Sequence, residues 1–457
     1  MRERTLREIA ADLDGVIRGA DAPVTSVATD TRELRPGSLF VALRGARVDG
    51  HDLMDEAARA GAAGALVERS VEAPIPTVEV PDTGAALLEL AARERDALAT
   101  PLVAITGSVG KTSVKDLTAA VLGARFRVTA SPRSFNTEVG VPLTILAADE
   151  RTEAIVCEMG SRGIGHISLL CDVAKPDVGV VTAVGAAHLE MFGSLDVVRD
   201  AKAELPEALS EGGTAVLNAD DPVVRGFVDR TRARPLLYGR SEGADVRAVE
   251  LSLDPEGVPS FTLVAGGERE RVELAVPGEH MASNALAAAA CGIALGLSPA
   301  ECAAALKDAT VSPWRMERRI TPEGVRVLND AYNANPMSMA AALRSAVWMK
   351  GEGRCIAVLG AMAELGPTAA AEHERVGELV ARLGVDRLVV VGDDARMIGI
   401  GAVREGVEPD RVRYCRDPEE AAATVRAEAR AGDVVLVKGS RAAGLERVAE
   451  RLWGDAP

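Results

Sequence analysis

The sequence predicts an α/β protein built from three domains. The chain has 457 residues, a length that suits about three domains of ordinary size. Short apolar runs alternate with Ala-rich helical stretches along the chain, a pattern typical of sheets covered by helices. Pro313 interrupts both periodicities and marks a natural boundary. We therefore expect domains at residues 1–98, 99–312 and 313–457.

The predicted elements differ between the three segments. In the first, residues 39–43 and 52–63 predict a strand and a helix of a small α/β unit. In the second, residues 242–280 predict an antiparallel extension of a parallel sheet, and residues 285–297 a buried Ala-rich helix. The parallel strands expected in the second and third segments cover residues 102–105, 154–157, 178–184, 214–218, 326–329, 355–360, 387–392 and 433–438.

A glycine-rich turn within residues 102–113, L-V-A-I-T-G-S-V-G-K-T-S, predicts a phosphate-binding loop. The turn lies between an apolar strand and a helix with an apolar face, the context that such a loop requires. Its glycines let backbone N–H groups approach phosphate oxygens, while Lys111 would contact the β- and γ-phosphates and Thr112 would bind Mg²⁺. The predicted cradle comprises Gly107, Ser108, Val109, Gly110, Lys111, Thr112 and Ser113.

The spacing of this loop departs from the usual pattern, which has a glycine where Ile105 stands. The loop is a shortened G-x-x-G-K-T form that begins at Gly107. The alternative is a plain glycine turn with an incidental lysine, and the flanking strand and helix argue against it.

Two further side chains are expected near the same end of the central sheet. Glu158 follows the strand predicted at 154–157, and His188 follows the strand predicted at 178–184. Ligands bind outside the carboxyl ends of parallel strands, so these two residues could hold Mg²⁺ near the γ-phosphate. The alternatives are a helix-start carboxylate for Glu158 and an ordinary loop histidine for His188.

Beyond Pro313, two features suit a second wall of a nucleotide site. Arg315 could stabilise the charge of a transferring phosphoryl group, although a surface ion pair is the commoner role. Residues 329–336, N-D-A-Y-N-A-N-P, carry more hydrogen-bonding capacity than a plain turn needs, although Asn and Pro are ordinary turn residues. No serine or cysteine nucleophile with a partnered base is visible.

Composition excludes several classes of protein. The formal net charge is −16 without a basic run, which argues against a nucleic-acid partner. The six cysteines are scattered without a C-x-x-C pair, so we expect free thiols and a cytoplasmic location. The charged N-terminal residues do not suit a signal peptide, and no apolar run reaches the length of a membrane span.

Together the motifs resemble the Mur ligases, the ATP-dependent amide ligases of peptidoglycan precursor synthesis. The shortened phosphate loop is that family's own form, which removes the mismatch at Ile105. Further matches, in the family's order, are S-F-N-T-E-V-G-V-P-L-T-I-L (134–146), E-M-G-S-R-G-I-G-H-I (158–167), A-A-H-L-E-M-F-G-S (186–194), A-K-A-E-L (201–205), N-A-D-D-P (218–222) and H-M-A-S-N-A-L-A-A (280–288).

Two segments resemble the family branch that adds D-alanyl-D-alanine: D-A-Y-N-A-N-P-M-S-M at 330–339 and A-E-L-G at 363–366. Residues 29–51 resemble the uridine-nucleotide-binding domain of that branch and of its tripeptide-adding neighbour. The chain departs from the branch at His166, where Glu is usual, and at Ala361, where Asp is usual. These departures put local contacts in doubt.

The resemblance implies a fold and an activity. The fold would have a small N-terminal α/β UDP-binding domain, a central parallel-sheet P-loop ATPase domain and a C-terminal Rossmann-like α/β domain that closes on it. The activity would join D-alanyl-D-alanine to UDP-N-acetylmuramoyl-tripeptide through an acyl phosphate, with ATP and Mg²⁺. A monomer is expected, although the residues carry no signal for oligomeric state.

The resemblance also assigns roles to residues. Lys111 would stabilise the transferring phosphoryl group, Thr112 and Glu158 would hold one Mg²⁺, and His188 would hold a second near a carbamylated Lys202. Without the resemblance, Lys202 reads as a solvated helix lysine. The nucleotide would be held by Asn284 at adenine, Arg315 at the phosphates and Asp330 at the ribose. The substrate-binding set comprises Thr31, Arg32, Arg44, Asp49 and His51 for uridine, Asn136 and Thr137 for the muramoyl-peptide, Asn333 and Asn335 for the dipeptide, and Ser161.

Three other activities compete with this interpretation. A P-loop switch or motor ATPase would hydrolyse ATP without a carboxylate or an amine, but it leaves the first domain unexplained. A sister ligase would add the third peptide residue instead. A folate-type polyglutamate ligase would share the central core without needing a uridine-binding domain.

Overall fold

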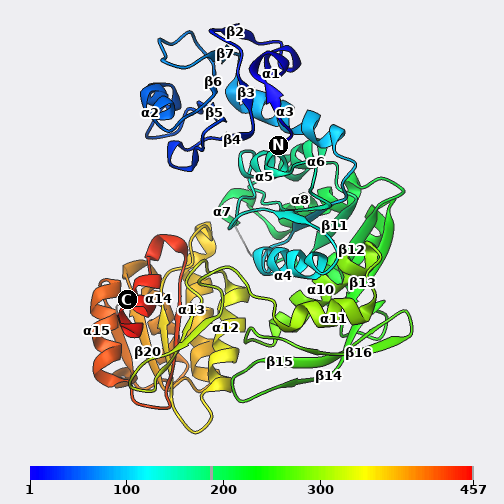
Figure 1. Cartoon of the computed structure of the whole chain (residues 1–457). Coiled ribbons are helices and arrows are strands. Elements are labelled where there is room, and N and C mark those ends of the chain that lie inside the picture. Colours follow the sequence, from blue (N-terminus) through cyan, green and yellow to red (C-terminus); the bar gives the residue numbers. More distant parts are fainter. Residues whose placement is uncertain (186–188, 455–457) are drawn as a thin grey trace.

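The computed structural model describes residues 1–185 and 189–454. It contains three large sheets in succession along the chain, each flanked by helices. Figure 1 shows the first part (blue) at one end, the central part (cyan to green) in the middle, and the last part (yellow to red) beside it. The predicted fold class is therefore confirmed. The exact boundaries 1–98, 99–312 and 313–457 stay a prediction.

The N-terminal sheet has five strands in the order β2-β7-β6-β5-β4, parallel except for β2. The strand predicted at residues 39–43 is β5. The helix predicted at 52–63 is shorter, because a 3₁₀ turn precedes it and Gly61 adopts φ +85° just after it. The elements are β1 (Arg4–Thr5), α1 (Leu6–Asp12), β2 (Val16–Arg18), β3 (Pro23–Val24), β4 (Ser26–Ala28), β5 (Ser38–Val41), α2 (Met54–Arg59), β6 (Gly64–Val67), β7 (Thr77–Glu79) and α3 (Thr83–Ala97).

The central sheet has nine strands in the order β16-β15-β14-β13-β12-β11-β8-β10-β9. The strands from β9 to β14 pair in parallel, while β15 and β16 pair antiparallel, which confirms the predicted extension. The strands are β8 (Leu102–Thr106), β9 (Val128–Ala130), β10 (Ala154–Glu158), β11 (Val178–Val181), β12 (Thr214–Asn218), β13 (Arg234–Gly239), β14 (Val246–Leu253), β15 (Pro259–Ala265) and β16 (Glu268–Glu273).

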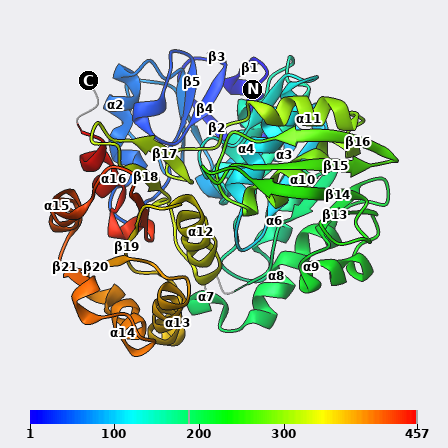
Figure 2. The same ribbon diagram turned by 90° about the horizontal axis from the view of Figure 1, so that it is seen from below.

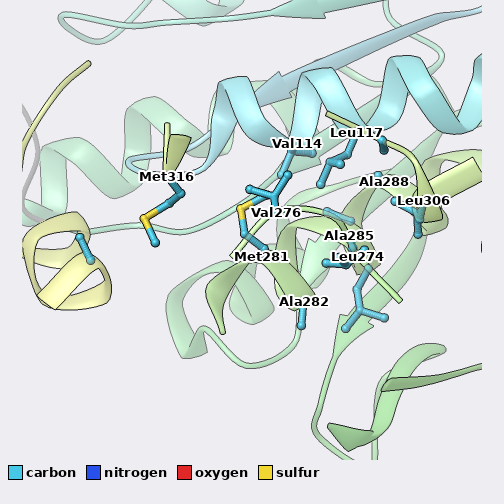
Figure 3. Close-up of a cluster of buried hydrophobic side chains, with 14 of the residues drawn as sticks. Val114, Leu117, Leu274, Val276, Met281, Ala282, Ala285, Ala288, Leu306 and Met316 are labelled. Carbon is cyan, nitrogen blue, oxygen red and sulfur yellow. The ribbon is translucent and has the colours of Figure 1, made fainter. Parts of the chain in front are cut away.

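The helices of the central part pack on this sheet and on one another. Figure 3 shows Val114 and Leu117 of α4 facing Met281 and Ala285 of α10 across a buried apolar cluster. Small alanine side chains let α10 approach closely, so the Ala-rich helix is buried as predicted. The helices are α4 (Lys111–Gly123), α5 (Gly140–Ala147), α6 (His166–Ala174), α7 (Leu189–Phe192), α8 (Leu195–Ala208), α9 (Pro222–Arg225), α10 (His280–Ala294) and α11 (Pro299–Lys307).

Strand β11 is three residues shorter than the predicted 178–184. The reason is a contact with the phosphate loop: Thr182 Oγ1 donates to Val109 O at 2.5 Å, and the Ser108 amide donates to Ala183 O at 2.8 Å. The Thr182 amide still donates to Thr106 O of β8 at 3.0 Å, and the chain then turns to the phosphate loop.

The C-terminal sheet has six strands in the order β17-β18-β22-β19-β20-β21, and only β17 is antiparallel. Figure 2 shows α12 between this sheet and the central part of the chain. The elements are β17 (Glu317–Ile320), β18 (Arg326–Asn329), α12 (Pro336–Met349), β19 (Cys355–Leu359), α13 (Ala369–Arg382), β20 (Arg387–Val391), α14 (Arg396–Arg404), β21 (Val412–Cys415), α15 (Pro418–Glu428), β22 (Val434–Lys438) and α16 (Glu446–Trp453).

The structure also shows the state of the six thiols and the length of the helices. All six cysteines are buried and unpaired, as predicted, and burial raises the pKa of thiols such as Cys157 to about 12. None of the helices within residues 1–185 and 189–454 is both long enough and apolar enough to cross a membrane.

A buried arginine joins the N-terminal and central parts. Arg95, in the last turn of α3, donates to Ala174 O at 2.7 Å, to Lys175 O at 3.1 Å and to Leu98 O at 2.9 Å. It also lies 3.0 Å from Asp177 Oδ2. The guanidinium thus satisfies carbonyls at the end of α6, where intrahelical partners are lacking.

Arg95→Ala is expected to lower the free energy of unfolding by about 3 kcal/mol, because the buried acceptors lose a charged donor. Arg93→Ala is the matched control, since within the described residues that arginine pairs only with two side chains that are at least partly exposed, Glu89 on the same helix and Asp12 of α1. Calorimetric unfolding of both variants would measure the difference. Equal midpoints would contradict the assigned role of Arg95.

Candidate active site

A cavity of about 470 Å³ lies at the carboxyl ends of the central strands, between the central and C-terminal parts. Parallel α/β sheets bind ligands at this edge. Its polar lining comes from the phosphate loop, from α10 and from the segment after β18. The residues that line it include Ser108, Val109, Gly110, Lys111, Thr112, Ser113, Ser134, Asn136, Glu158, His280, Ser283, Asn284, Arg315, Asp330, Tyr332, Asn333, Asn335 and Lys438.

The shortened phosphate loop requires its glycines. Gly107 adopts φ +144°, and a Cβ there would lie 1.9 Å from Thr182 Oγ1. Gly110 adopts φ +81°, and a Cβ there would lie 2.8 Å from Asn284 Oδ1. Lys111 begins α4, and its ammonium donates to Gly107 O at 2.7 Å. The Lys111 side chain therefore closes the loop. The backbone N–H groups of the loop can then bind phosphate oxygens in the cavity.

Thr112 and Glu158 meet at the base of the cavity. Thr112 Oγ1 donates to Glu158 Oε2 at 2.6 Å, and Asn136 Nδ2 donates to Glu158 Oε1 at 2.8 Å. Glu158 ends β10, as predicted, and is 1% exposed. Two oxygen ligands beside a phosphate site suit Mg²⁺, which is commonly held by one or two protein oxygens together with substrate phosphates.

The predicted second metal site cannot be assembled from the described residues. His188 lies outside them. Elsewhere in residues 1–185 and 189–454, no group of three or more His, Cys, Asp and Glu side chains is arranged to hold a metal.

Arg315 reaches the phosphate loop from the linker before the C-terminal sheet. Its Nη2 donates to Thr112 Oγ1 at 2.7 Å and to Ser134 Oγ at 3.2 Å. The guanidinium carbon lies 4.1 Å from the centroid of the Tyr332 ring, a cation–π distance. The alternative of a surface ion pair is therefore wrong, because Arg315 is part of the cavity wall.

The segment after β18 is held by a lysine to which the sequence assigns no role. Lys438 is 1% exposed, and its ammonium lies 2.5 Å from Asp330 Oδ2 and 2.9 Å from Asn333 O. Asp330 Oδ1 also accepts from the Met316 amide at 3.1 Å. Asp330 thus faces the cavity with a paired carboxylate, and its contact with a ribose stays a prediction.

The other predicted nucleotide and dipeptide residues also face this cavity. Asn284 lies beside Gly110, as the glycine geometry shows. Asn335 caps α12 and donates from Nδ2 to Ser108 O at 3.4 Å, which joins the C-terminal part to the phosphate loop. Asn333 lines the same wall. Their ligands stay predictions.

A second cavity of about 130 Å³ adjoins the first, since Lys111 and Asn136 line both. Lys202 faces it, is 2% exposed and donates to Ser161 Oγ at 2.9 Å. Burial, and then the neighbouring Lys111, lower the pKa of Lys202 well below its usual value. The solvated-lysine alternative is wrong. The complete lining is Lys111, Asn136, Thr137, Glu138, Gly160, Ser161, Arg162, His166, Lys202 and Glu364.

The two departures from the family pattern have local contacts. His166 lines the second cavity, accepts from the Arg162 amide at 3.4 Å and lies 3.5 Å from Glu138 Oε1. Ala361 accepts from the Ser440 amide at 2.9 Å through its backbone, a bond available to any residue. Only the first departure changes the lining of a cavity.

The loop that carries Ser161 is fixed by α8. Glu204, two residues beyond Lys202, accepts from the Gly165 amide at 2.6 Å and from the Ser168 amide at 3.0 Å. A carboxylate at a helix N-terminus satisfies free N–H groups and complements the helix dipole. Glu204 therefore caps α6 and holds the loop against α8.

Glu204→Ala is expected to lower the free energy of unfolding by about 1 kcal/mol. It should also speed amide hydrogen exchange at Gly165 and Ser168, because their N–H groups lose an acceptor. Glu207→Ala provides the control, since that carboxylate makes only an exposed pair with Arg230. Exchange mass spectrometry that finds unchanged protection in the Glu204 variant would contradict the capping role.

The five residues predicted for uridine lie in the N-terminal part, and none lines either cavity. Both ring nitrogens of His51 are used: Nδ1 lies 2.6 Å from Asp49 Oδ1, and Nε2 accepts from the Glu68 amide at 2.9 Å. Arg44 pairs with Glu68 at 3.0 Å. Thr31 and Arg32 form the 3₁₀ turn that Asp30 caps. The ligand of these residues stays a prediction.

Comparison with known proteins identifies the family. The description "Mur ligase family, catalytic domain" matches residues 23–95, "Mur ligase middle domain" matches 105–292, and "Mur ligase, glutamate ligase domain" matches 314–441. The chain is 44% identical to the UDP-N-acetylmuramoyl-tripeptide–D-alanyl-D-alanine ligase of Mycobacterium tuberculosis (strain H37Rv), covering 100% of this chain and 98% of that protein. This chain belongs to the Mur ligase family. The resemblance drawn from its motifs is confirmed.

Other Mur ligases agree over the full length. The ligase of the same name from Bacillus subtilis is 35% identical, with 99% of both chains covered. The crystal structure of MurF from Acinetobacter baumannii has a TM-score of 0.89 at 28% identity and covers 99% of both chains. MurF from Thermotoga maritima, solved in complex with ADP, has a TM-score of 0.82 at 31% identity and covers 94% of this chain and 97% of that one.

Proposed function

We propose that this Mur ligase joins D-alanyl-D-alanine to UDP-N-acetylmuramoyl-tripeptide, with ATP converted to ADP and phosphate. The relatives that match it end to end carry that activity in their names. The observation that carries the proposal is the adjacency of the two cavities, which share Lys111 and Asn136. A phosphoryl group bound in the first cavity is thereby next to a carboxylate bound in the second.

The chemistry needs two steps, because a carboxylate oxygen is a poor leaving group. The terminal carboxylate of the tripeptide attacks the γ-phosphorus of ATP, which gives an acyl phosphate and ADP. The uncharged amine of the dipeptide then attacks the acyl carbon, and the tetrahedral intermediate expels phosphate as the amide forms. The protein contributes positioning and charge neutralisation, since no side chain needs to form a covalent intermediate.

The residues of the first cavity suit the phosphoryl transfer. Lys111 and Arg315 would neutralise charge on the transferring group from opposite domains. Thr112 and Glu158 would hold Mg²⁺, which supplies charge neutralisation at the β- and γ-phosphates. His188 and a carbamylated Lys202 would hold a second Mg²⁺, because a carbamate presents an anionic oxygen where an ammonium could not bind a cation.

Each of the three domains would bind a different ligand. Residues 1–98 would hold the uridine nucleotide, residues 99–312 ATP, and residues 313–457 the dipeptide through Asn333 and Asn335. Closure of the third domain on the second would exclude water that hydrolyses an acyl phosphate. Small-angle scattering with an ATP analogue and both substrates should then detect compaction.

We further propose that the enzyme is a cytoplasmic monomer.

The test is ADP release by the purified protein with the nucleotide-tripeptide and D-alanyl-D-alanine, each omitted in turn. Release should need the nucleotide-tripeptide, and sustained turnover should need both. Release that ignores both omissions would indicate a switch or motor ATPase and overturn the proposal. Turnover with the dipeptide-bearing nucleotide and a diamino acid would indicate the sister ligase instead.

A further inference from the structure

Two consecutive charged residues of α4, Lys115 and Asp116, lie one turn beyond the phosphate loop and outside both cavities. Lys115 is 3% exposed. Its ammonium donates to Ser131 O at 2.9 Å and to Arg133 O at 3.1 Å, and it lies 2.6 Å from Asp116 Oδ1. A lysine has three donors, so each has a partner within the protein. Such partners make burial of the ammonium tolerable.

The Lys115 side of the pair fixes a loop of the active site. Arg133 adopts φ +50°, a conformation that a non-glycine residue keeps only where contacts enforce it. The next residue is Ser134, whose Oγ lies 3.2 Å from Thr112 Oγ1 and 3.2 Å from Arg315 Nη2. The ammonium that holds the Arg133 carbonyl therefore also sets the position of the Ser134 hydroxyl.

The Asp116 side of the pair fixes the linker to the C-terminal domain. Asp116 Oδ2 accepts from the Ser312 amide at 2.7 Å. Three residues later the linker presents Arg315 to the phosphate loop, and both neighbours of Arg315 are left-handed: Trp314 has φ +60° and Met316 has φ +54°. Strain on both sides shows that contacts, and not local preference, place this arginine.

We infer that Lys115 and Asp116 are positioning residues that bring Ser134 and Arg315 together on the two sides of Thr112. Each carboxylate oxygen of Asp116 has one task, since Oδ1 binds Lys115 and Oδ2 binds the linker. The pair lies on the helix that begins at the phosphate loop, so it connects nucleotide, loop and linker through one rigid element. Neither residue touches the proposed ligands. The inference rests on the proposed function, because it assigns to Arg315 a role in phosphoryl transfer.

Asp116→Ala should release the linker and misplace Arg315. We expect a fall of about 10- to 100-fold in kcat for ADP release, because small misplacements of a catalytic group have effects of that size. KM for ATP should change less than threefold, since the phosphate loop is intact and the lost contact matters most in the transition state. Asp116→Asn keeps an acceptor for the Ser312 amide and should recover most of the activity.

The decisive measurement is a double-mutant cycle with Arg315→Ala. If Asp116 acts through Arg315, the Asp116→Ala change should lower kcat less than threefold in the Arg315→Ala background. A loss that multiplies with that of Arg315→Ala, or a rise in KM for ATP at unchanged kcat, would overturn the inference. Asp308→Asn is the matched control, an exposed carboxylate four residues before Ser312, and should leave kcat unchanged.

The same set of variants separates a loss of folding from a loss of catalysis. Thermal unfolding of each variant identifies any general destabilisation. If Asp116→Ala does not fold, Ser312→Pro, which removes the amide that Asp116 Oδ2 accepts from, takes its place in the cycle with Arg315→Ala. An Asn variant that is folded yet as impaired as complete removal of Arg315 would overturn the role given to the linker contact. Wild-type ADP release that ignores both substrates would overturn the proposed function instead, whatever the cycle shows.

Discussion

Replacing Lys111 with methionine is expected to lower kcat for ADP release on the order of 10³-fold. The ammonium is the one cation that lines both cavities among the described residues. It therefore lies where the phosphoryl group must pass between donor and acceptor. Methionine keeps an unbranched side chain of similar length, so the change removes mainly the charge.

The electrostatic environment of Lys111 supports a role with a bound anion. Burial lowers the pKa of its ammonium, Glu158 opposes that effect, and Arg315 adds to it. Phosphates in the cavity would favour the charged form. The loss in kcat with ATP bound should therefore far exceed any change in the stability of the free protein, where the substitution removes only the bond to Gly107 O.

A coupled assay for ADP with both substrates present measures the effect. Lys307→Met, at the exposed end of α11, serves as the control and should keep full activity. A Lys111→Met protein that loses less than tenfold would show that other groups neutralise the transferring phosphoryl group.

Much of the architecture could be predicted from the sequence. The strands predicted at residues 214–218 and 326–329 coincide with β12 and β18. Apolar runs bounded by turn residues carry that information locally. The end of β11 could not be predicted in this way, because the Thr182 side chain and the Ala183 carbonyl bind the phosphate loop, which is more than 70 residues away.

The candidate site shows the same difference between residues predicted from local motifs and residues placed by long-range contacts. Lys111, Thr112 and Glu158 belong to motifs whose spacing indicates their chemistry, and the structure brings them together. Ser134 was missed, and Tyr332 was singled out only as part of residues 329–336, because their contacts with Arg315 arise only when the linker is placed against α4. The sequence carries a weak signal for Ser134, which is the first residue of the matched segment 134–146.

His51, one of the residues that the resemblance assigns to uridine binding, shows what the structure adds to the sequence. An imidazole in a matched segment suggests a ligand contact, yet both of its nitrogens are bound within the chain. Its observed task is to hold Asp49 and the Glu68 backbone in place. Its contribution to uridine binding stays a prediction.

Replacing Lys202 with arginine is expected to lower kcat about 100-fold or more, because loss of a direct Mg²⁺ ligand should exceed the roughly 10- to 100-fold effect of altering only the outer partners of a metal site. Arginine keeps a positive charge and a similar length, but its guanidinium stays protonated and cannot form a carbamate. A lysine needed only as a donor to Ser161 Oγ would tolerate this change much better. The substitution therefore separates a structural lysine from a carbamylated one.

Carbamate formation joins the uncharged amine to CO₂ and releases a proton, so it depends on the fraction of neutral lysine. Because burial and Lys111 lower the pKa of Lys202, that fraction is larger near neutral pH than for an exposed lysine and rises further as the pH increases. Wild-type protein depleted of CO₂ should lose activity and regain it on addition of bicarbonate. The Lys202→Arg variant should not respond. Activity of the wild type that is indifferent to CO₂ at every pH would exclude the carbamate, and the buried amine would then act through Ser161 alone.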